Sequence, residues 1–267
     1  MKAPYLHGYS LAERKRLIDQ ANYLKETLYR QIRFPKKGKV LEVGCAVGAQ
    51  LGILDQRFPG IHLLGVDLSL QQLSEAKTYL KTQGINRPNL VQGDARKLPF
   101  SKSSLDAIFT CWFFEHVSHP IIILKECRRV LKPKKRIYMT EVENNSVCIW
   151  PESKPFKRFW NAFNKTQLSF KGDPFVGKKL YPLLKESGFS KIKVYPITFH
   201  YNQGSPQGFT RFVAFFFRIG QSAVKQIVQN GGITENDARR GLREFCQIAK
   251  HPNGVISFTC YRGIGTR

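Results

Sequence analysis

The sequence has no long hydrophobic run. In its 267 residues the longest strongly apolar stretches are 121–124 and 212–217, whereas a helix that crosses a bilayer needs about 20 such residues. The N-terminal residues 1–10 contain no continuous apolar block and no small-residue cleavage site, which argues against a secretory signal. We therefore expect a cytoplasmic protein without a membrane span.

The sequence also lacks the cysteine patterns of metal sites and disulfide-rich domains. Its six cysteines lie far apart, with no Cys-x-x-Cys pair and no nearby pair of histidines. Isolated cysteines are most often reduced, small apolar side chains in a protein interior. We expect neither a metal nor a disulfide at these positions, which are Cys45, Cys111, Cys127, Cys148, Cys246 and Cys260.

Acidic residues are scarce. There are 19 Asp and Glu against 43 Lys and Arg, a formal net charge of +24, so a nucleic-acid partner has to be considered. However, the basic residues are spread along the chain, with no Arg-rich tail and a densest stretch only at 132–136. Spread charge favours solubility and acidic ligands in general. Nucleic acid is thus a possible but not a favoured partner of a monomer or homodimer.

Periodic apolar positions predict an α/β domain, without repeats. Ser10 and Glu13 form a capping box, so a helix should begin there and carry its apolar stripe up to Ile32, before Pro35. Short apolar runs then alternate with helical segments, which is typical of βαβ units and a parallel sheet. The expected strands are 39–43, 61–66, 89–92, 105–110, 136–142, 191–199 and 255–262. The expected helices are 48–57, 70–82, 119–131, one around 180–187, 207–229 and 234–249. Residues 144–175 are rich in aromatics and proline without a clear period, and we expect an inserted cap.

A glycine-bearing turn carries the strongest signal for function. The buried strand 40–43 runs into Gly44 and, four residues later, Gly48, so that backbone amides can approach a ligand. Asp67 ends the second strand, where an acid can accept both hydroxyls of a ribose. Asp94 follows the third strand and could accept from an adenine amino group. These loops should meet at one crevice, where open α/β sheets bind ligands.

Four segments, 41–48, 65–69, 93–100 and 114–117, resemble the successive motifs of class I S-adenosylmethionine-dependent methyltransferases. The likeness covers about residues 38–142. It implies S-adenosylmethionine as cofactor and a Rossmann-like seven-stranded sheet in the order 3-2-1-4-5-7-6, with the last strand antiparallel and helices on both faces. Segments 7–10, 181–184 and 208–211 look like a small-molecule subgroup with an N-terminal helical lid. The expected parts are a lid at 1–35, a cofactor-binding core at 36–143, a cap insertion at 144–175 and a completion of the sheet with two helices at 176–267.

The resemblance also assigns cofactor-binding residues. Glu42, Gly44 and Gly48 would shape the methionine end of the pocket, with backbone contacts from Cys45 and Ala46. Asp67 would hold the ribose. The adenine would lie against Asp94 and Ala95, with Leu68 and Gln72 nearby. The chain departs from the family pattern at two places, because Ala46 replaces a glycine of the turn and Lys134-Lys135 replaces Gly-Gly before the fifth strand.

Catalytic and acceptor-binding candidates are fewer. Glu115 and His116 follow the fourth strand, and His116 is a candidate general base for a hydroxyl acceptor, the alternative being a structural helix-entry turn. Tyr9 is a candidate to close over the cofactor, or else to staple the first helix, and Arg16 and Gln20 on that helix could reach the methionine carboxylate. Acceptor-binding candidates are Trp112, Phe113, Glu141 and Trp150, the rival roles being core packing for the aromatics and surface solvation for the glutamate.

The leading interpretation is transfer of a methyl group to O, N or S of a small organic molecule. RNA or protein methylation is the first alternative because of the charge, although no recognition module is appended and no Asn/Asp-Pro-Pro-Tyr loop follows the fourth strand. A dinucleotide-dependent oxidoreductase is disfavoured, since the turn lacks the Gly-x-Gly-x-x-Gly spacing and Glu42 would repel a pyrophosphate. The third alternative is a protein that binds the cofactor but does not transfer its methyl group.

Overall fold

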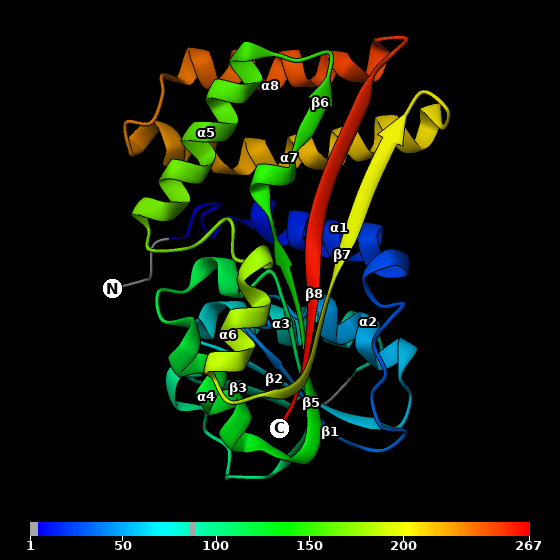
Figure 1. Ribbon diagram of the computed structural model, residues 1–267, viewed down its shortest axis with the longest axis vertical. Coiled ribbons are helices and arrows are strands. Elements are labelled where there is room, and N and C mark those ends of the chain that lie inside the picture. Colours follow the sequence, from blue (N-terminus) through cyan, green and yellow to red (C-terminus); the bar gives the residue numbers. More distant parts are fainter. Residues whose placement is uncertain (1–4, 86–88) are drawn as a thin grey trace.

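The computed structural model describes residues 5–85 and 89–267, so residues 1–4 of the expected lid and 86–88 of the expected core lie outside the described part. The molecule has two layers, a lower one built around the sheet and an upper one made mainly of helices (Figure 1). The strands are β1 Gly38–Val43, β2 Ile61–Asp67, β3 Asn89–Gln92, β4 Leu105–Cys111, β5 Leu131–Val142, β6 Cys148–Trp150, β7 Ser190–Asn202 and β8 Val255–Thr266. The helices are α1 Leu11–Leu28, α2 Ala49–Arg57, α3 Leu70–Thr82, α4 Pro120–Val130, α5 Lys154–Ser169, α6 Leu180–Glu186, α7 Pro206–Gln229 and α8 Glu235–Gln247.

The sheet has the expected Rossmann-like order. Strands β3, β2, β1, β4 and β5 are parallel neighbours, β8 pairs antiparallel with β5, and β7 pairs with β8. When the short strand β6 is left out of the count, β7 is the sixth strand and β8 the seventh. The predicted order 3-2-1-4-5-7-6 is therefore confirmed. The sequence did not predict β6. This strand pairs with residues 255–257 of β8, whereas β5 pairs with β8 only from Cys260 onward. Strand β6 thereby satisfies backbone groups of β8 that would otherwise be left without a ladder partner.

Helix starts follow the local sequence. The Ser10 hydroxyl accepts a hydrogen bond from the Glu13 amide at 3.2 Å, and Ser69 accepts one from the Gln72 amide at 3.3 Å. Each bond satisfies one of the free amides of a first helical turn. Both predicted helix starts are confirmed, and α3 has the predicted bounds.

Helix α1 ends earlier than its apolar stripe predicts. Its last residue is Leu28, whereas the stripe continues to Ile32. Arg262 of β8 is fully buried and donates a hydrogen bond from its guanidinium to the Leu28 carbonyl. A cationic donor at the last carbonyls of a helix stabilises its end. The helix therefore stops where a distant residue meets it, and the prediction that it extends to Pro35 was wrong.

Residues 144–175 contain a regular helix that the sequence analysis missed. Ser153 caps α5 by accepting from the Phe156 amide at 3.1 Å. The buried positions Phe156, Phe159, Trp160 and Phe163 have helical spacing. Helix α5 packs on α7 and α8, and we call these three helices the helical cap. Helices α7 and α8, which belong to the segment expected to complete the sheet, lie together with the expected insertion in the upper part of Figure 1.

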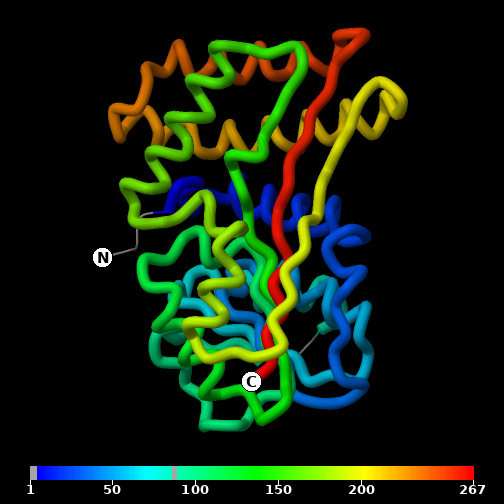
Figure 2. The backbone as a smooth tube through the Cα atoms, in the orientation of Figure 1, coloured from blue at the N-terminus to red at the C-terminus, as the bar shows by residue number. Residues whose placement is uncertain are grey.

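Long strands connect the two layers. Figure 2 shows β7 and β8 running side by side from the sheet up to the helical cap, with α1 between the two layers. One buried cluster joins α1, α2, β8 and the helical cap, and a second lies between the other face of the sheet and helices α4 and α6. Among the described residues, no helix has the length and apolar character needed to cross a bilayer.

Candidate functional site

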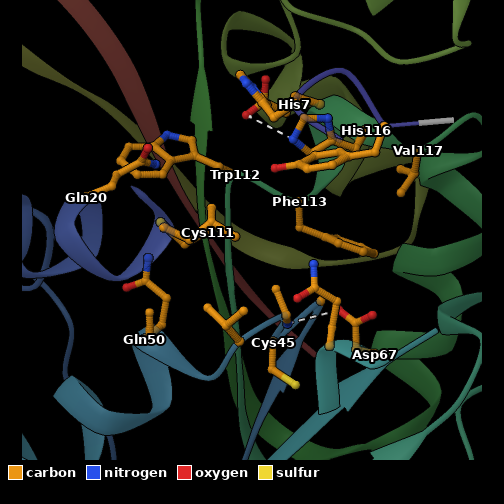
Figure 3. Close-up of a pocket in the computed structure, with 18 of the residues that line it drawn as sticks. His7, Gln20, Cys45, Gln50, Asp67, Cys111, Trp112, Phe113, His116 and Val117 are labelled. Atoms are coloured by element: carbon orange, nitrogen blue, oxygen red, sulfur yellow. Dashed lines mark hydrogen bonds and ion pairs between the residues drawn. The ribbon is translucent and has the colours of Figure 1, made fainter. Parts of the chain in front are cut away.

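A cavity of about 860 Å³ lies where the carboxyl ends of β1, β2 and β4 face the helical cap. In Figure 3, Cys45 and Asp67 lie at its lower end, Phe113 in the middle, and His7 and His116 at the top. Ligands of open α/β sheets bind at this edge, and binding cavities commonly measure roughly 300–1,000 Å³. The predicted loops therefore do converge on one cavity.

The turn after β1 adopts the conformation expected of a glycine turn. Gly44 has a φ of +75°, and a Cβ atom built on it would lie 2.3 Å from Cδ2 of Phe113. Ala46 has a φ of +43°, in the left-handed region that favours glycine. Gly48, with a φ of +74°, begins α2. Replacing the family's glycine by Ala46 has thus kept the turn, at the cost of local strain.

Two acids at the strand ends are buried to different extents. Asp67 accepts hydrogen bonds from the amides of Ala46 and Ser69, both at 2.9 Å. Burial raises the pKa of the Asp67 carboxyl, and the backbone hydrogen bonds oppose the rise. Glu42 is fully buried, and its pKa is raised well above the usual value, first by burial and then by the nearby charge of Asp67.

Buried acceptor atoms without partners line this end of the cavity. Among the described residues, Oε2 of Glu42 and Oε1 of Gln72 have no hydrogen-bond partner. Buried polar atoms are normally hydrogen-bonded, so such exceptions in a cavity wall indicate a place for a ligand's donors.

The predicted adenine-side residues lie at the cavity, but Asp94 is engaged. Arg96 donates to Asp94 from its side chain at 2.6 Å, and this hydrogen bond is the main cause of the lowered pKa of the Asp94 carboxyl. Ala95 lines the cavity, and so does Leu68, whose surface is 58% exposed.

The N-terminal segment and α1 cover one side of the cavity. Tyr9 and Gln20 both line it. Arg16 also lines it, but forms a bidentate ion pair with Glu13, with both N–O distances 2.6 Å, and donates a third hydrogen bond to Gln20. The Tyr5 hydroxyl donates to Glu13 at 3.1 Å. The charge of Arg16 is therefore already compensated within the protein.

Glu141 supports the turn after β4 and does not line the cavity. Its carboxylate accepts hydrogen bonds from the amides of Phe113, Phe114 and Glu115 at 3.2, 3.0 and 3.3 Å. Complete burial and the neighbouring Glu115 raise the pKa of Glu141 to about 8. Its carboxyl group thus faces the backbone of the turn, and Glu141 is not among the residues that line the cavity.

The turn itself presents the predicted aromatic and histidine side chains to the cavity. Trp112 has a φ of +52°, a strained conformation for a bulky residue that often marks functional sites. Trp112, Phe113, Glu115 and His116 all line the cavity. Nε2 of His116 lies 3.6 Å from Oε1 of Glu115, whose other oxygen accepts from Gln167 at 2.7 Å.

Trp150 lies away from the cavity, and other aromatics take the place predicted for it. It belongs to β6, is 56% exposed and does not line the cavity. His7 also lines the cavity and was not among the predicted site residues, although it belongs to the segment 7–10 that resembles the subgroup. The helical cap and the ends of β7 and β8 supply the remaining aromatic lining, namely Trp160, Phe163, Phe199, Phe212, Phe215, Phe216 and Phe258.

Comparisons with known proteins agree with this geometry. Residues 41–139 match the family described as "Methyltransferase domain". A demethylmenaquinone methyltransferase of Thermotoga maritima is 32% identical over 140 residues, which are 52% of this chain and 56% of that protein. A sterol 24-C-methyltransferase of Gibberella zeae is 35% identical over 96 residues, 36% of this chain and 25% of that protein. The matches thus span about half or less of these two curated relatives.

Solved structures share the fold over nearly the whole chain. Phosphoethanolamine N-methyltransferase 2 of Haemonchus contortus, in complex with S-adenosylhomocysteine, has a TM-score of 0.56 and 18% identity, covering 92% of this chain and 52% of that one. A Bacillus halodurans methyltransferase has a TM-score of 0.57 and 16% identity, covering 93% and 98% of the two chains. The matched domain at 41–139, the sheet order and the glycine turn thus agree with the resemblance to class I S-adenosylmethionine-dependent methyltransferases.

Proposed function

We propose that the protein transfers the methyl group of S-adenosylmethionine to O, N or S of a small organic molecule. One observation carries the proposal: a single cavity is lined at one end by the glycine turn and Asp67, and at the other end by the aromatic side chains of the helical cap. A donor and an acceptor can therefore lie in the same cavity, which is what a transfer between two small molecules requires.

The residues at the lower end of the cavity fit the cofactor. The unpartnered Oε2 of Glu42 suits the ammonium of its methionine part, and Gly44, Cys45 and Ala46 line the cavity beside it. The predicted residue Gly48 does not line the cavity, because it faces Ala76 and Leu80 of α3. Asp67 suits the ribose hydroxyls. Gln72, Leu68 and Ala95 suit the adenine, and Asp94 could join them only by sharing its contact with Arg96.

We further propose that the segment up to residue 35 acts as the lid, with Tyr9 and Gln20 over the cofactor. Tyr9 lies close enough to Asp67 for that charge to contribute to the raised pKa of its hydroxyl, after burial. When bound, S-adenosylmethionine supplies a methyl group on a positively charged sulfur, which leaves as a neutral thioether. The residues of the chain then have mainly to align the acceptor, and such alignment can lower a barrier by about 7–11 kcal/mol.

The names of the relatives favour a small acceptor. A demethylated menaquinone, a sterol and a phosphorylated ethanolamine are the molecules that those proteins are named for. The net charge of +24 supports a second candidate, RNA methylation. That candidate predicts methylation of RNA whose yield falls steeply as salt is added.

Calorimetry with S-adenosylhomocysteine and NAD tests the proposal. We expect the wild type and the control Asp55→Ala, at an exposed position of α2, to bind S-adenosylhomocysteine and not NAD. Asp67→Ala should bind it far more weakly. Radiolabel transfer to phenols, amines, thiols and total RNA then identifies the acceptor class. Binding of NAD in preference to S-adenosylhomocysteine would overturn the proposal.

A further inference from the structure

His7 brings a second imidazole to the acceptor side of the cavity. Its ring centroid lies 6.4 Å from that of His116, with the rings perpendicular, and 5.8 Å from that of Phe163 in the helical cap. Both histidines lie above Phe113 in Figure 3, on the side opposite Asp67 and Cys45. The ring lines the cavity and keeps part of its surface accessible there.

A hydrogen-bond chain fixes the tautomer of His7. Its Nδ1 lies 2.7 Å from Oγ of Ser222, and the same Oγ lies 2.9 Å from the carbonyl oxygen of Ile219. A carbonyl can only accept, and a serine hydroxyl has a single proton to donate. Both contacts are hydrogen bonds only if Ser222 donates to Ile219 and His7 donates to Ser222 from Nδ1. The lone pair of the neutral imidazole then lies on Nε2.

The surroundings keep this imidazole neutral. Burial lowers the pKa of His7 well below its usual value, and the nearby Arg16 and His116 lower it further. The titratable groups around it are Tyr5 of the N-terminal segment, Glu13 and Arg16 of α1, and Glu115 and His116 of the turn after β4. The carboxylate of Glu13 is taken up by the ion pair with Arg16, and among the described residues no carboxylate contributes to the pKa of His7.

The neighbouring part of the cavity suits an uncharged aromatic molecule. Trp160 stacks on Phe163 with centroids 4.7 Å apart, and Phe216 lies 5.2 Å from Trp160. The acids that line the cavity are at the strand ends, apart from Glu115, which is held by Gln167 and His116. A charged acceptor among these rings would lose its hydration and would find no free counter-ion among the residues that the structure describes.

We propose that Nε2 of His7 takes the proton from the hydroxyl of an apolar, phenol-type acceptor that lies among these aromatic side chains. The inference rests on the proposed function. The hydroxyl oxygen forms the new bond to the methyl carbon while the sulfur–methyl bond breaks and its electron pair stays on sulfur. The hydroxyl proton passes to Nε2 and from there to solvent. Ser222 is a positioning residue, since it holds Nδ1 protonated.

The first test needs no acceptor. Nitrogen and carbon NMR shifts of the His7 ring, assigned by comparison with His7→Ala, should report the Nδ1-protonated neutral form at pH 7 and below. Ser222→Ala should give a mixture of the two neutral tautomers of His7. The control Thr210→Ala, which removes an exposed hydroxyl from the same helix α7, should not. A ring protonated at pH 7, or one with Nε2 protonated, would overturn the proposal.

Kinetics with 2-naphthol, and with 2-naphthylmethylamine as a cation of matched size, give the second test. We expect methylation of the naphthol, with kcat lowered in His7→Ala by roughly 10²–10⁴-fold, the usual contribution of a general base. Binding of S-adenosylhomocysteine should stay unchanged, and so should the rate of His62→Ala, an exposed histidine on β2. The wild-type rate should persist to acidic pH, whereas the His7→Ala rate should rise with pH as the naphthol itself ionises.

Each result separates the two proposals. If S-adenosylhomocysteine does not bind the wild type, the proposed function fails. If it binds but only the amine is methylated, or no phenol is, the acceptor class is wrong. If the naphthol is methylated and His7→Ala retains the kcat and the pH profile of the wild type, the assignment of His7 is wrong.

Discussion

The backbone amide of Ala46 donates a 2.9 Å hydrogen bond to Oδ2 of Asp67, joining the turn after β1 to the acid that ends β2. The residue that donates this bond has a left-handed backbone with a φ of +43°, so the strained position of the turn is also the one that holds the Asp67 carboxylate. The strain of the turn and the orientation of the proposed ribose ligand are therefore coupled. A substitution at position 46 should change both protein stability and cofactor affinity.

Ala46→Gly should stabilise the protein. The left-handed conformation costs an alanine about 1–2 kcal/mol, while glycine loses about 0.5–1 kcal/mol more backbone entropy on folding. The expected net gain in the free energy of unfolding is roughly 0.5–1 kcal/mol. Ala46→Val should be destabilising, because a β-branched residue tolerates positive φ least. Denaturant unfolding of the three proteins measures this, and a less stable glycine variant would contradict the strain.

Glu42 should release a proton when S-adenosylhomocysteine binds. Burial and the charge of Asp67 hold its pKa well above the usual value, which favours the protonated form of Glu42 in the free protein. A ligand ammonium beside Oε2 favours the carboxylate and lowers this pKa. Affinity should therefore rise with pH, and titrations in phosphate and Tris should give different binding enthalpies. Glu42→Gln should bind more weakly and show no such difference between buffers.

Gly44→Ala should disturb the turn after β4, through Phe113. The added Cβ would lie 2.3 Å from Cδ2 of that ring, and relieving such an overlap typically costs about 1–3 kcal/mol. Gly84→Ala is the matched control, because Gly84 has a comparable φ of +83° with nothing within 4 Å of its added Cβ. Both variants should lose stability from backbone strain, and Gly44→Ala should in addition lose affinity for S-adenosylhomocysteine. Equal effects of the two substitutions would rule out the contact with Phe113.

The parts of the fold that depend on neighbouring residues in sequence could be predicted. The strand-turn-helix unit around Gly44, the start of α3 at Ser69 and the acid at Asp67 each follow from patterns a few residues long. Helix α5 could have been found in the same way, from Ser153 and the buried spacing of Phe156 and Phe159. The many aromatic and proline residues around it obscured that pattern.

Other features depend on contacts between distant segments, which a single sequence does not reveal. The end of α1 is set by Arg262, 234 residues after Leu28 in the chain. Strand β6 exists because β8 extends past the end of β5. Glu141 was expected to bind the methyl acceptor, but its carboxyl group accepts hydrogen bonds from three backbone amides of the turn after β4. The orientation of His7 depends in the same way on Ser222, 215 positions away.

Glu141 should make the protein less stable as pH rises from about 5 to 8. Its pKa is about 8 in the folded protein against 4.5 when unperturbed, so over this range the folded state retains a proton that the unfolded state has lost. The free energy of unfolding then falls with pH, at most by about 1.4 kcal/mol per pH unit. The contribution is fully present below pH 4.5 and is lost above about pH 8.

Glu141→Gln should remove this pH dependence and lose stability at low pH, since the amide nitrogen of the glutamine cannot accept a hydrogen bond from the backbone of the turn. Denaturant unfolding at pH 5, 6, 7 and 8 measures both, and parallel pH dependences of the two proteins would mean that Glu141 is ionised in the folded state.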